Sequence, residues 1–167
     1  KFDINTPYYK SGERPLIHLE ASPCIIACPI HMDIPGYLSL AAEGKLEEAY
    51  QLIRRTNPLP SVCGHVCYHP CEDTCKRHYV YQPLAVAAIK RFVTDQVDIE
   101  SMEIPQVSKN GKKVAIIGSG PCGLAAAHDL ALLGYGVTIF EALSEIGGMM
   151  RVGIPEYRIS REVVQKD

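Results

Sequence analysis

The segment "KKVAIIGSGPCGLAAAHDLALLGYGVTIFEA" constrains the fold of this 167-residue chain more than any other segment. It reads as a continuous apolar strand, a glycine turn, an alanine-rich helix from about Pro121 to Leu133, and a second apolar strand at 136–140. Strand, glycine turn, helix and strand in this order form the first unit of a doubly wound, Rossmann-like sheet. The segment therefore predicts the start of an α/β domain.

The turn "GSGPCG" has the spacing of a dinucleotide-binding loop. Gly118 permits the tight turn, Gly120 lets a pyrophosphate approach the backbone, and Gly123 lets the helix pack on the strand. We assign Pro121, at the start of the helix, to the same loop. Glu141 follows about twenty residues after the loop, where a carboxylate can hold a ribose hydroxyl pair. The pattern favours dinucleotide binding over a plain glycine-rich turn.

Cysteines provide the second constraint. "CGHVCYHPCEDTC" places four cysteines at four-residue intervals, and two more precede it in "PCIIACPIHMDIPGY". Thiolates are soft ligands suited to iron-sulfur clusters or zinc, so these six could hold one or two metal centres. The candidate ligands are Cys24, Cys28, Cys63, Cys67, Cys71 and Cys75. We expect the seventh, Cys122, to be a small buried residue.

The residues around the cysteines predict short helices. Asp33 can cap a helix that Gly44 ends, a second helix follows at about 45–56, and "PLAVAAIKRFVTDQV" predicts a third with an apolar stripe. The cysteine run itself is expected on turns and half-turns, with Glu72 and Asp73 as solvated acids. We expect an extended arm at 1–22, a helical domain at 23–97, a linker at 98–111 and a partial Rossmann-like domain at 112–167.

Composition excludes several classes. The formal net charge of −2 gives no broad basic surface, so nucleic acid is not expected as a partner. No run is long and apolar enough to span a membrane, and the polar start lacks the apolar core of a signal peptide. Seven cysteines suit metal ligation better than a disulfide framework. The sequence reads as a cytoplasmic protein.

Two motif groups carry a resemblance to a known family. "EALSEIGGMMRVGIPEYRIS" resembles the segment after the first strand pair of flavoproteins with two dinucleotide-binding domains, where Gly147 and Gly148 match a second glycine pair. "GIPEYR" resembles a signature of the glutamate synthase small-subunit family. That family includes the amino-terminal part of dihydropyrimidine dehydrogenase and the flavin subunits of NADH-dependent ferredoxin:NADP oxidoreductases. Residues 23–96 resemble its α-helical iron-sulfur domain.

The resemblance implies FAD in the Rossmann-like domain and 4Fe-4S chemistry in the helical domain. In fuller members, Cys24, Cys28 and Cys67 would bind one cluster with a glutamate or glutamine, whose position appears as Lys90 here; an ammonium cannot ligate. Cys71 and Cys75 would bind a second cluster with a CxxC pair. Here the stretch in place of that pair is "LIHLEAS", which has no cysteine.

One 4Fe-4S cluster is therefore the simplest expectation, with Cys63 nearest in sequence to act as the fourth ligand and Cys71 or Cys75 as alternatives. Two clusters remain open if His65, His69 or a partner chain completes them. A Cys₄ zinc site on Cys63, Cys67, Cys71 and Cys75 is the structural alternative.

We expect an electron-transfer subunit or fragment of a multi-subunit oxidoreductase that relays electrons between NAD(P)H, FAD and iron-sulfur clusters. Catalytic completeness is not expected of it alone, because one strand-helix-strand unit cannot close a doubly wound sheet. Its partners would be other redox subunits, including a chain or segment that completes the FAD and NAD(P)H domains. A glutamate synthase small subunit proper and a non-enzymatic, zinc-holding adaptor are the alternatives.

Overall fold

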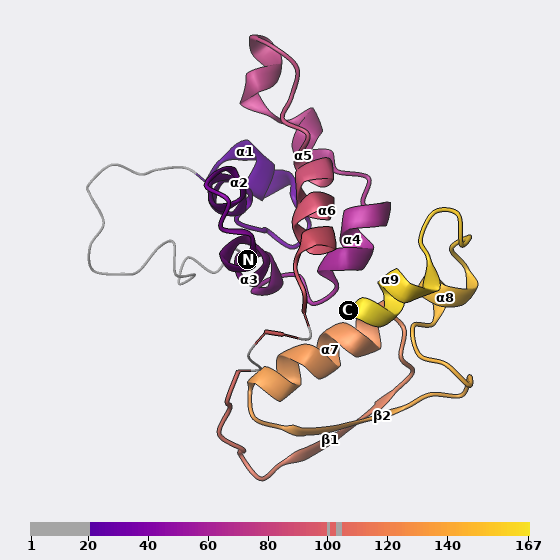
Figure 1. Ribbon diagram of the computed structural model, residues 1–167. Helices are drawn as coiled ribbons and strands as arrows, with labels where there is room; N and C mark the ends of the chain where they lie inside the picture. The colour runs from indigo at the N-terminus through magenta and orange to yellow at the C-terminus, as the bar shows by residue number, and fades with distance from the viewer. Residues whose placement is uncertain (1–20, 100, 103–104) are drawn as a thin grey trace.

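The computed structural model describes residues 21–99, 101–102 and 105–167, so the arm expected at 1–22 lies almost wholly outside the described residues. Figure 1 shows a helical part above and a strand-helix-strand part below it. The helical elements are α1 (Pro23–Ala27), α2 (Ile34–Ala42), α3 (Leu46–Arg54), α4 (Pro60–Val66), α5 (Pro70–Asp73), the 3₁₀ helix η2 (Lys76–Tyr79) and α6 (Val86–Gln96). After them come β1 (Lys113–Ile117), α7 (Pro121–Leu132), β2 (Gly136–Phe140), α8 (Met149–Val152) and α9 (Arg161–Lys166).

The helical part packs around one core. Tyr37 of α2, Tyr50 and Ile53 of α3 and Val93 of α6 are almost completely buried in it. The expected cap is present, because the Asp33 side chain accepts the Gly36 N–H at 3.0 Å. Short helices of this kind depend on such tertiary burial for their stability.

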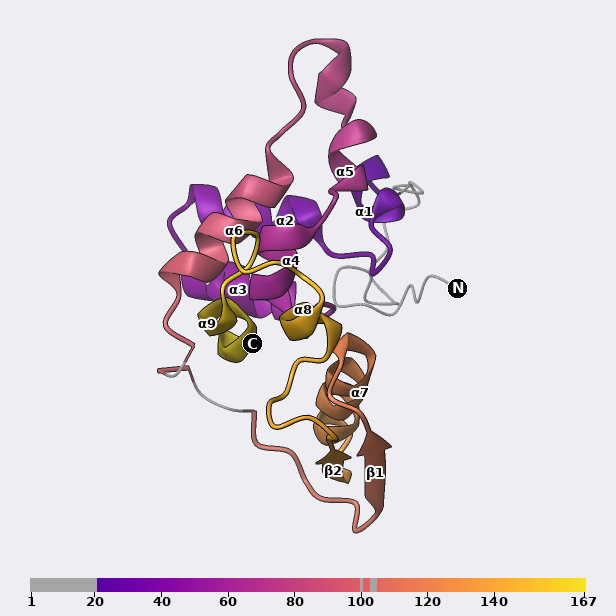
Figure 2. The same ribbon diagram turned by 90° about the vertical axis from the view of Figure 1, so that its right-hand side faces the viewer.

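The cysteine run is more helical than expected. α4 and α5 cover much of it, and His69 between them adopts a left-handed backbone conformation with φ 50°. After α5, the chain projects away from the body through η2 before it returns along α6, as Figures 1 and 2 show.

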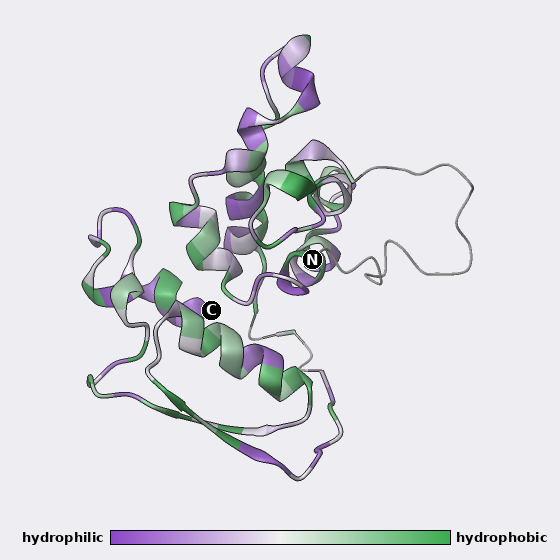
Figure 3. Cartoon of the chain, turned by 180° about the vertical axis from the view of Figure 1, so that it is seen from behind, coloured by the Kyte–Doolittle hydropathy of each residue, from purple (hydrophilic) through white to green (hydrophobic). Residues whose placement is uncertain are grey.

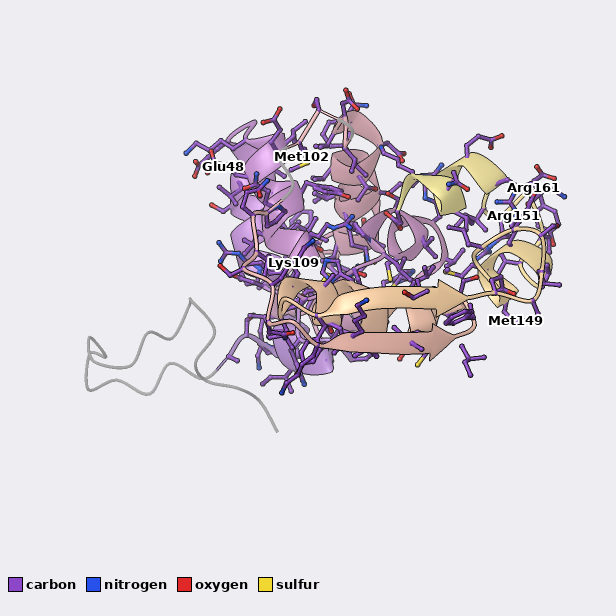
Figure 4. All side chains as sticks on the ribbon, turned by 90° about the horizontal axis from the view of Figure 1, so that it is seen from below. Glu48, Met102, Lys109, Met149, Arg151 and Arg161 are labelled. Carbon is purple, nitrogen blue, oxygen red and sulfur yellow. The ribbon has the colours of Figure 1, made fainter. Side chains whose placement is uncertain are left out.

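The lower part is a parallel β-α-β unit. β1 pairs with β2 in register from Lys113 with Gly136 to Ile117 with Phe140, and α7 packs against both strands. Figure 4, seen from below, shows the two strands side by side in front of α7. Ile117 is 92% exposed, and parallel sheets are normally covered on both faces. These observations confirm the predicted fold class, a helical domain followed by the first part of a Rossmann-like domain.

The two parts share a second, smaller core. Val62 of α4 packs with Met150 of α8, Val164 of α9 and Ile159, while Leu124 of α7 borders the group. In Figure 3, α7 is mainly hydrophobic along its length, whereas the projecting tip around η2 carries more hydrophilic residues. The helical part and the nucleotide-type part therefore make a joint apolar contact.

Asp167 ties this junction with hydrogen bonds. Its Oδ1 accepts the Ser61 N–H at 3.0 Å and its Oδ2 accepts the Val62 N–H at 2.8 Å. Both amides belong to the first turn of α4, whose N-cap residue, Leu59, cannot accept a hydrogen bond through its side chain. The carboxylate thus caps α4 from a distant part of the chain.

Replacing Asp167 with alanine should lower the free energy of unfolding by about 1–3 kcal/mol, because two amide donors lose their acceptor. Chemical denaturation measures the change. Asp95→Ala is the matched control, since the Asp95 carboxylate only pairs with Arg91 at an exposed site and its loss should cost about 0.5 kcal/mol or less. Equal losses in the two variants would contradict the capping role.

Candidate functional site

Two short helices bring the first cysteine pair beside the run. Cys24 lies in α1 and Cys28 directly follows it, while Cys71 is buried on α5, which packs against α1. Thr74 Oγ1 donates to Pro23 O at 3.3 Å and so fixes α5 on α1. Residues nearly fifty positions apart therefore reach one side of the helical core.

Cys67 lies at the end of α4. Its Sγ accepts the His69 N–H at 3.3 Å, a contact that the left-handed backbone of His69 makes possible. Backbone N–H groups directed at sulfur are part of the normal surroundings of a metal-binding thiolate.

Tyr37 is buried in the part of the helical core that contains cysteines. Its ring is fully buried on α2, and its pKa is raised far above the usual range by burial and by the nearby Cys71, Cys28, Cys24 and Cys67 thiols. Its hydroxyl has no hydrogen-bond partner among the residues that the structure describes. Tyr37 shares its buried core with Cys28 and Cys71, and Cys24 packs against that core, so the unsatisfied donor lies in an environment that suits a sulfur-rich group. We name Cys24, Cys28, Cys67 and Cys71 the thiol quartet.

Burial, together with the neighbouring Cys28 and Cys67 thiols, raises the pKa of Cys71 to about 11. Lys90 acts in the opposite direction. Because a metal ligates the thiolate, metal binding at such a site releases protons and relieves the repulsion between adjacent sulfurs.

Cys63 and Cys75 differ from the quartet. Burial raises the pKa of Cys63, while the Lys90 charge and the Asn57 side chain lower it. Cys75 directly precedes η2 at the base of the projecting tip. The helical core therefore contains Cys28 and Cys71 with Cys24 packed against it, whereas Cys63 and Cys75 are not part of that core.

Among the described residues, no three His, Cys, Asp or Glu side chains converge closely enough to hold a single metal ion, and this is true of the thiol quartet as well as of the Cys₄ set considered for zinc. The histidines proposed as additional ligands face protein oxygens, since His65 Nδ1 contacts Ser61 O at 2.9 Å and His69 Nδ1 lies 3.5 Å from Glu72 Oε2.

Glu72 is not the solvated acid that the sequence suggested, whereas Asp73 is exposed. Glu72 Oε1 accepts the Ala87 N–H at 2.8 Å, in the first turn of α6. The N-cap residue there is Ala85, which offers no side-chain acceptor. Glu72 thus caps α6 and connects it to the helix that carries Cys71.

Replacing Glu72 with alanine should destabilise the helical part by about 1–2 kcal/mol, because a helix-terminal amide loses its acceptor. Thermal or chemical unfolding measures the change. Asp73→Ala, a change in the same helix at an exposed acid, should stay within about 0.5 kcal/mol of wild type. A larger loss in Asp73→Ala than in Glu72→Ala would contradict the assignment.

The glycine loop has the geometry that its spacing predicts. Gly118 has φ +94°, and a Cβ added to Gly123 would lie 2.1 Å from Gly118 O, so helix and strand touch there. A Cβ on Gly120 would meet nothing within 4 Å. Pro121 opens α7. An open space therefore lies over Gly120 at the start of a helix, where amide groups attract phosphate.

The second glycine pair lies directly against the first loop. A Cβ on Gly148 would meet Gly120 Cα at 2.8 Å, and Gly147 N–H donates to Ser119 O at 3.1 Å and to Ser119 Oγ at 3.2 Å. Two motifs that the sequence separates by more than twenty residues thus form one surface.

Glu141 follows β2 and reaches back to the same loop. Its Oε2 accepts Ser119 N–H at 2.8 Å and Ser119 Oγ–H at 2.5 Å, and its Oε1 accepts Leu143 N–H at 2.8 Å. The Leu143 amide and the Ser119 donors lower the pKa of this carboxyl to about 2, so it is anionic at neutral pH. A carboxylate has about four acceptor positions, so capacity remains for a ribose hydroxyl.

The expectation for Cys122 is wrong. Cys122 is exposed in the first turn of α7. Sequence reasoning also overlooked Ser119 and Tyr37 as site residues. Ser119 stands between two motif glycines, which was the available signal, whereas nothing in the sequence indicates that cysteines pack around Tyr37.

Comparison with known proteins agrees with this geometry. Residues 13–102 match the family described as dihydropyrimidine dehydrogenase domain II, 4Fe-4S cluster, and residues 116–158 match the NAD(P)-binding Rossmann-like domain. The chain is 43% identical to the NADP(+)-dependent formate dehydrogenase subunit beta of Moorella thermoacetica, over 86% of this chain and 24% of that protein. It is 46% identical to the NADPH-Fe(3+) oxidoreductase subunit beta of Geobacter sulfurreducens, over 87% and 22%.

The Escherichia coli glutamate synthase [NADPH] small chain is 38% identical, over 86% of this chain and 31% of the relative. The protein belongs to the family of dihydropyrimidine dehydrogenase domain II-like 4Fe-4S proteins, with a Rossmann-type domain following. It is homologous to subunits of oxidoreductases and spans less than a third of each of these three relatives. Among the described residues, no helix is long and apolar enough to cross a membrane.

Proposed function

We propose that this chain relays electrons within a multi-subunit NAD(P)H-dependent oxidoreductase, with one 4Fe-4S cluster in its helical part and FAD on its glycine loop. The observation that carries the proposal is the thiol quartet around the unsatisfied Tyr37 hydroxyl. When bound, the flavin would supply two-electron exchange with a nicotinamide and the cluster would supply one-electron transfer.

The ligand set that we propose is Cys24, Cys28, Cys67 and Cys71. This set replaces Cys63 with Cys71 as the fourth thiolate, because Cys71 shares the buried core with Cys28. Lys90, buried on α6, stands near Cys71 and would offset part of the negative charge of the sulfur ligands instead of ligating.

The glycine loop would bind the dinucleotide phosphates through backbone amides. Gly120 leaves the space, Gly147 and Gly148 close it from one side, and Glu141 would hold ribose hydroxyls with the acceptor capacity that remains. We favour FAD over NAD(P) for this first loop on the resemblance of the Gly147–Gly148 segment to flavoproteins.

The partners that we propose are chains or segments that complete the sheet. β1 and β2 leave large apolar side chains exposed, Ile117 and Phe140 among them, which suits coverage by further α/β structure. The formate dehydrogenase subunit among the relatives makes a large redox assembly a more suitable setting than an adaptor. A role as a glutamate synthase small subunit remains the second candidate, because that small chain is among the similar proteins.

The relay is tested by adding NADPH or NADH, under anaerobic conditions, to the assembled oxidoreductase that contains this chain. The expected result is an electron paramagnetic resonance signal of a reduced 4Fe-4S cluster, absent from a Cys71→Ser assembly. Reduction of the flavin without any cluster signal, in an assembly that retains its iron, would contradict the relay.

A further inference from the structure

The Tyr37 hydroxyl is a buried donor without a visible acceptor. The residue is 0% exposed, and among the described residues its Oη forms no hydrogen bond. An unsatisfied buried hydroxyl destabilises the folded state, so native proteins rarely retain one without a reason. A phenylalanine would fill the same space without this cost.

The second buried tyrosine provides a direct contrast. Tyr50 is 1% exposed in the same core, yet its Oη accepts a hydrogen bond from Arg54 Nη1 at 3.1 Å. The core can therefore satisfy a tyrosine hydroxyl with its own residues. The Tyr37 hydroxyl has no such partner, although Tyr37 shares this core with Cys28 and Cys71.

The residues around Tyr37 distinguish it from Tyr50. Tyr37 belongs to the apolar core that contains Cys28 and Cys71, with Cys24 packed against it. Cys71 lies on α5, which packs against α1 where Cys24 lies, and Cys67 is at the end of the preceding helix, α4. A phenolic O–H aimed at sulfur ligands can donate to a thiolate or to a bridging sulfide, and hydrogen bonds to such sulfurs set the reduction potential of iron-sulfur clusters.

We propose that the Tyr37 hydroxyl donates a hydrogen bond to the sulfur of the bound iron-sulfur cluster and thereby raises its reduction potential. The proposal rests on the proposed function, since it needs a cluster in the quartet. The hydrogen bond is stronger to the reduced cluster, which carries one more negative charge, so it stabilises the reduced form. Tyr37 is a positioning and tuning residue, not a ligand.

The test compares Tyr37→Phe with Tyr50→Phe in the assembled protein, with iron and sulfide quantified before an anaerobic redox titration followed by electron paramagnetic resonance. Tyr37→Phe should keep the iron content of wild type and shift the midpoint potential to a more negative value. Tyr50→Phe should have the same midpoint potential as the wild type, because the Tyr50 hydroxyl accepts a hydrogen bond from Arg54. An unchanged potential in a fully loaded Tyr37→Phe protein would overturn the proposal.

A second measurement tests the proposal if Tyr37→Phe fails to fold or to bind the cluster. Biosynthetic replacement of tyrosine by 3-fluorotyrosine makes the phenol a stronger hydrogen-bond donor. The midpoint potential of the cluster in the labelled protein should therefore rise. The same rise is expected in a labelled Tyr50→Phe protein. No shift in this labelled protein would overturn the proposal. Wild-type protein without iron and sulfide would instead overturn the proposed function itself, which keeps the two failures distinct.

Discussion

Replacing Cys71 with serine is expected to remove most of the bound iron and sulfide, whereas Cys63→Ser leaves both at the wild-type level. Cys71 is buried in the same core as Cys28, whereas Cys63 is not part of that core; burial raises the pKa of Cys63, and the Asn57 side chain acts in the opposite direction. Because changes to groups that only support a ligand already cost about 10–100-fold in metal affinity, loss of a ligand should cost at least that.

Iron and sulfide analysis of anaerobically purified protein measures the difference, and the two variants control for each other because both replace a partly or fully buried thiol in the same run. Loss of iron in Cys63→Ser together with its retention in Cys71→Ser would instead favour the ligand nearest in sequence.

Gly120→Val is expected to weaken dinucleotide binding strongly without unfolding the loop. A Cβ at Gly120 meets no protein atom within 4 Å, but a valine side chain there would occupy the space that a pyrophosphate needs. We expect the affinity for FAD to fall by about a hundredfold, equivalent to about 2.7 kcal/mol. Flavin retention during gel filtration, with thermal unfolding in parallel, measures both effects in the assembled protein.

Two further glycines make this prediction specific. Gly123→Ala should lose the fold of the loop as well as the flavin, because the new Cβ would lie 2.1 Å from Gly118 O. Gly136→Ala, in β2, makes only ordinary contacts and should change neither property. Full flavin binding by Gly120→Val would contradict the phosphate site.

Much of the fold could be read from the sequence because local signals agree with it. The apolar strands, the glycine spacing and the proline-opened helix all lie where they were expected, and Asp33 caps α2 as predicted. These features depend on neighbouring residues, so spacing alone reveals them.

The helix starts at α4 and α6 could not be read in this way. Leu59 and Ala85 stand at the N-cap positions, and neither can accept a hydrogen bond through its side chain. The acceptors are Asp167 and Glu72, which come from other parts of the chain. A search for capping residues near each helix start misses both, and it is tertiary structure that supplies them.

In the candidate site, too, some features are evident from the sequence and others depend on tertiary packing. The chain's six-cysteine pattern and its loop glycines were evident, but which four cysteines gather depends on how α5 packs on α1. Proximity in sequence favoured Cys63, while packing favours Cys71. The exposed position of Cys122 and the turn of Glu141 toward Ser119 likewise follow from the arrangement of α7 and β2, not from the motif.

If the thiol quartet holds one 4Fe-4S cluster, the protein must contain iron and sulfide in matching amounts. Iron, acid-labile sulfide and zinc are quantified per chain after anaerobic purification, and the visible spectrum is recorded. We expect about four irons and about four sulfides, with a broad absorption that bleaches on reduction. About one zinc with no sulfide would contradict it, and would make the cysteines a structural metal site.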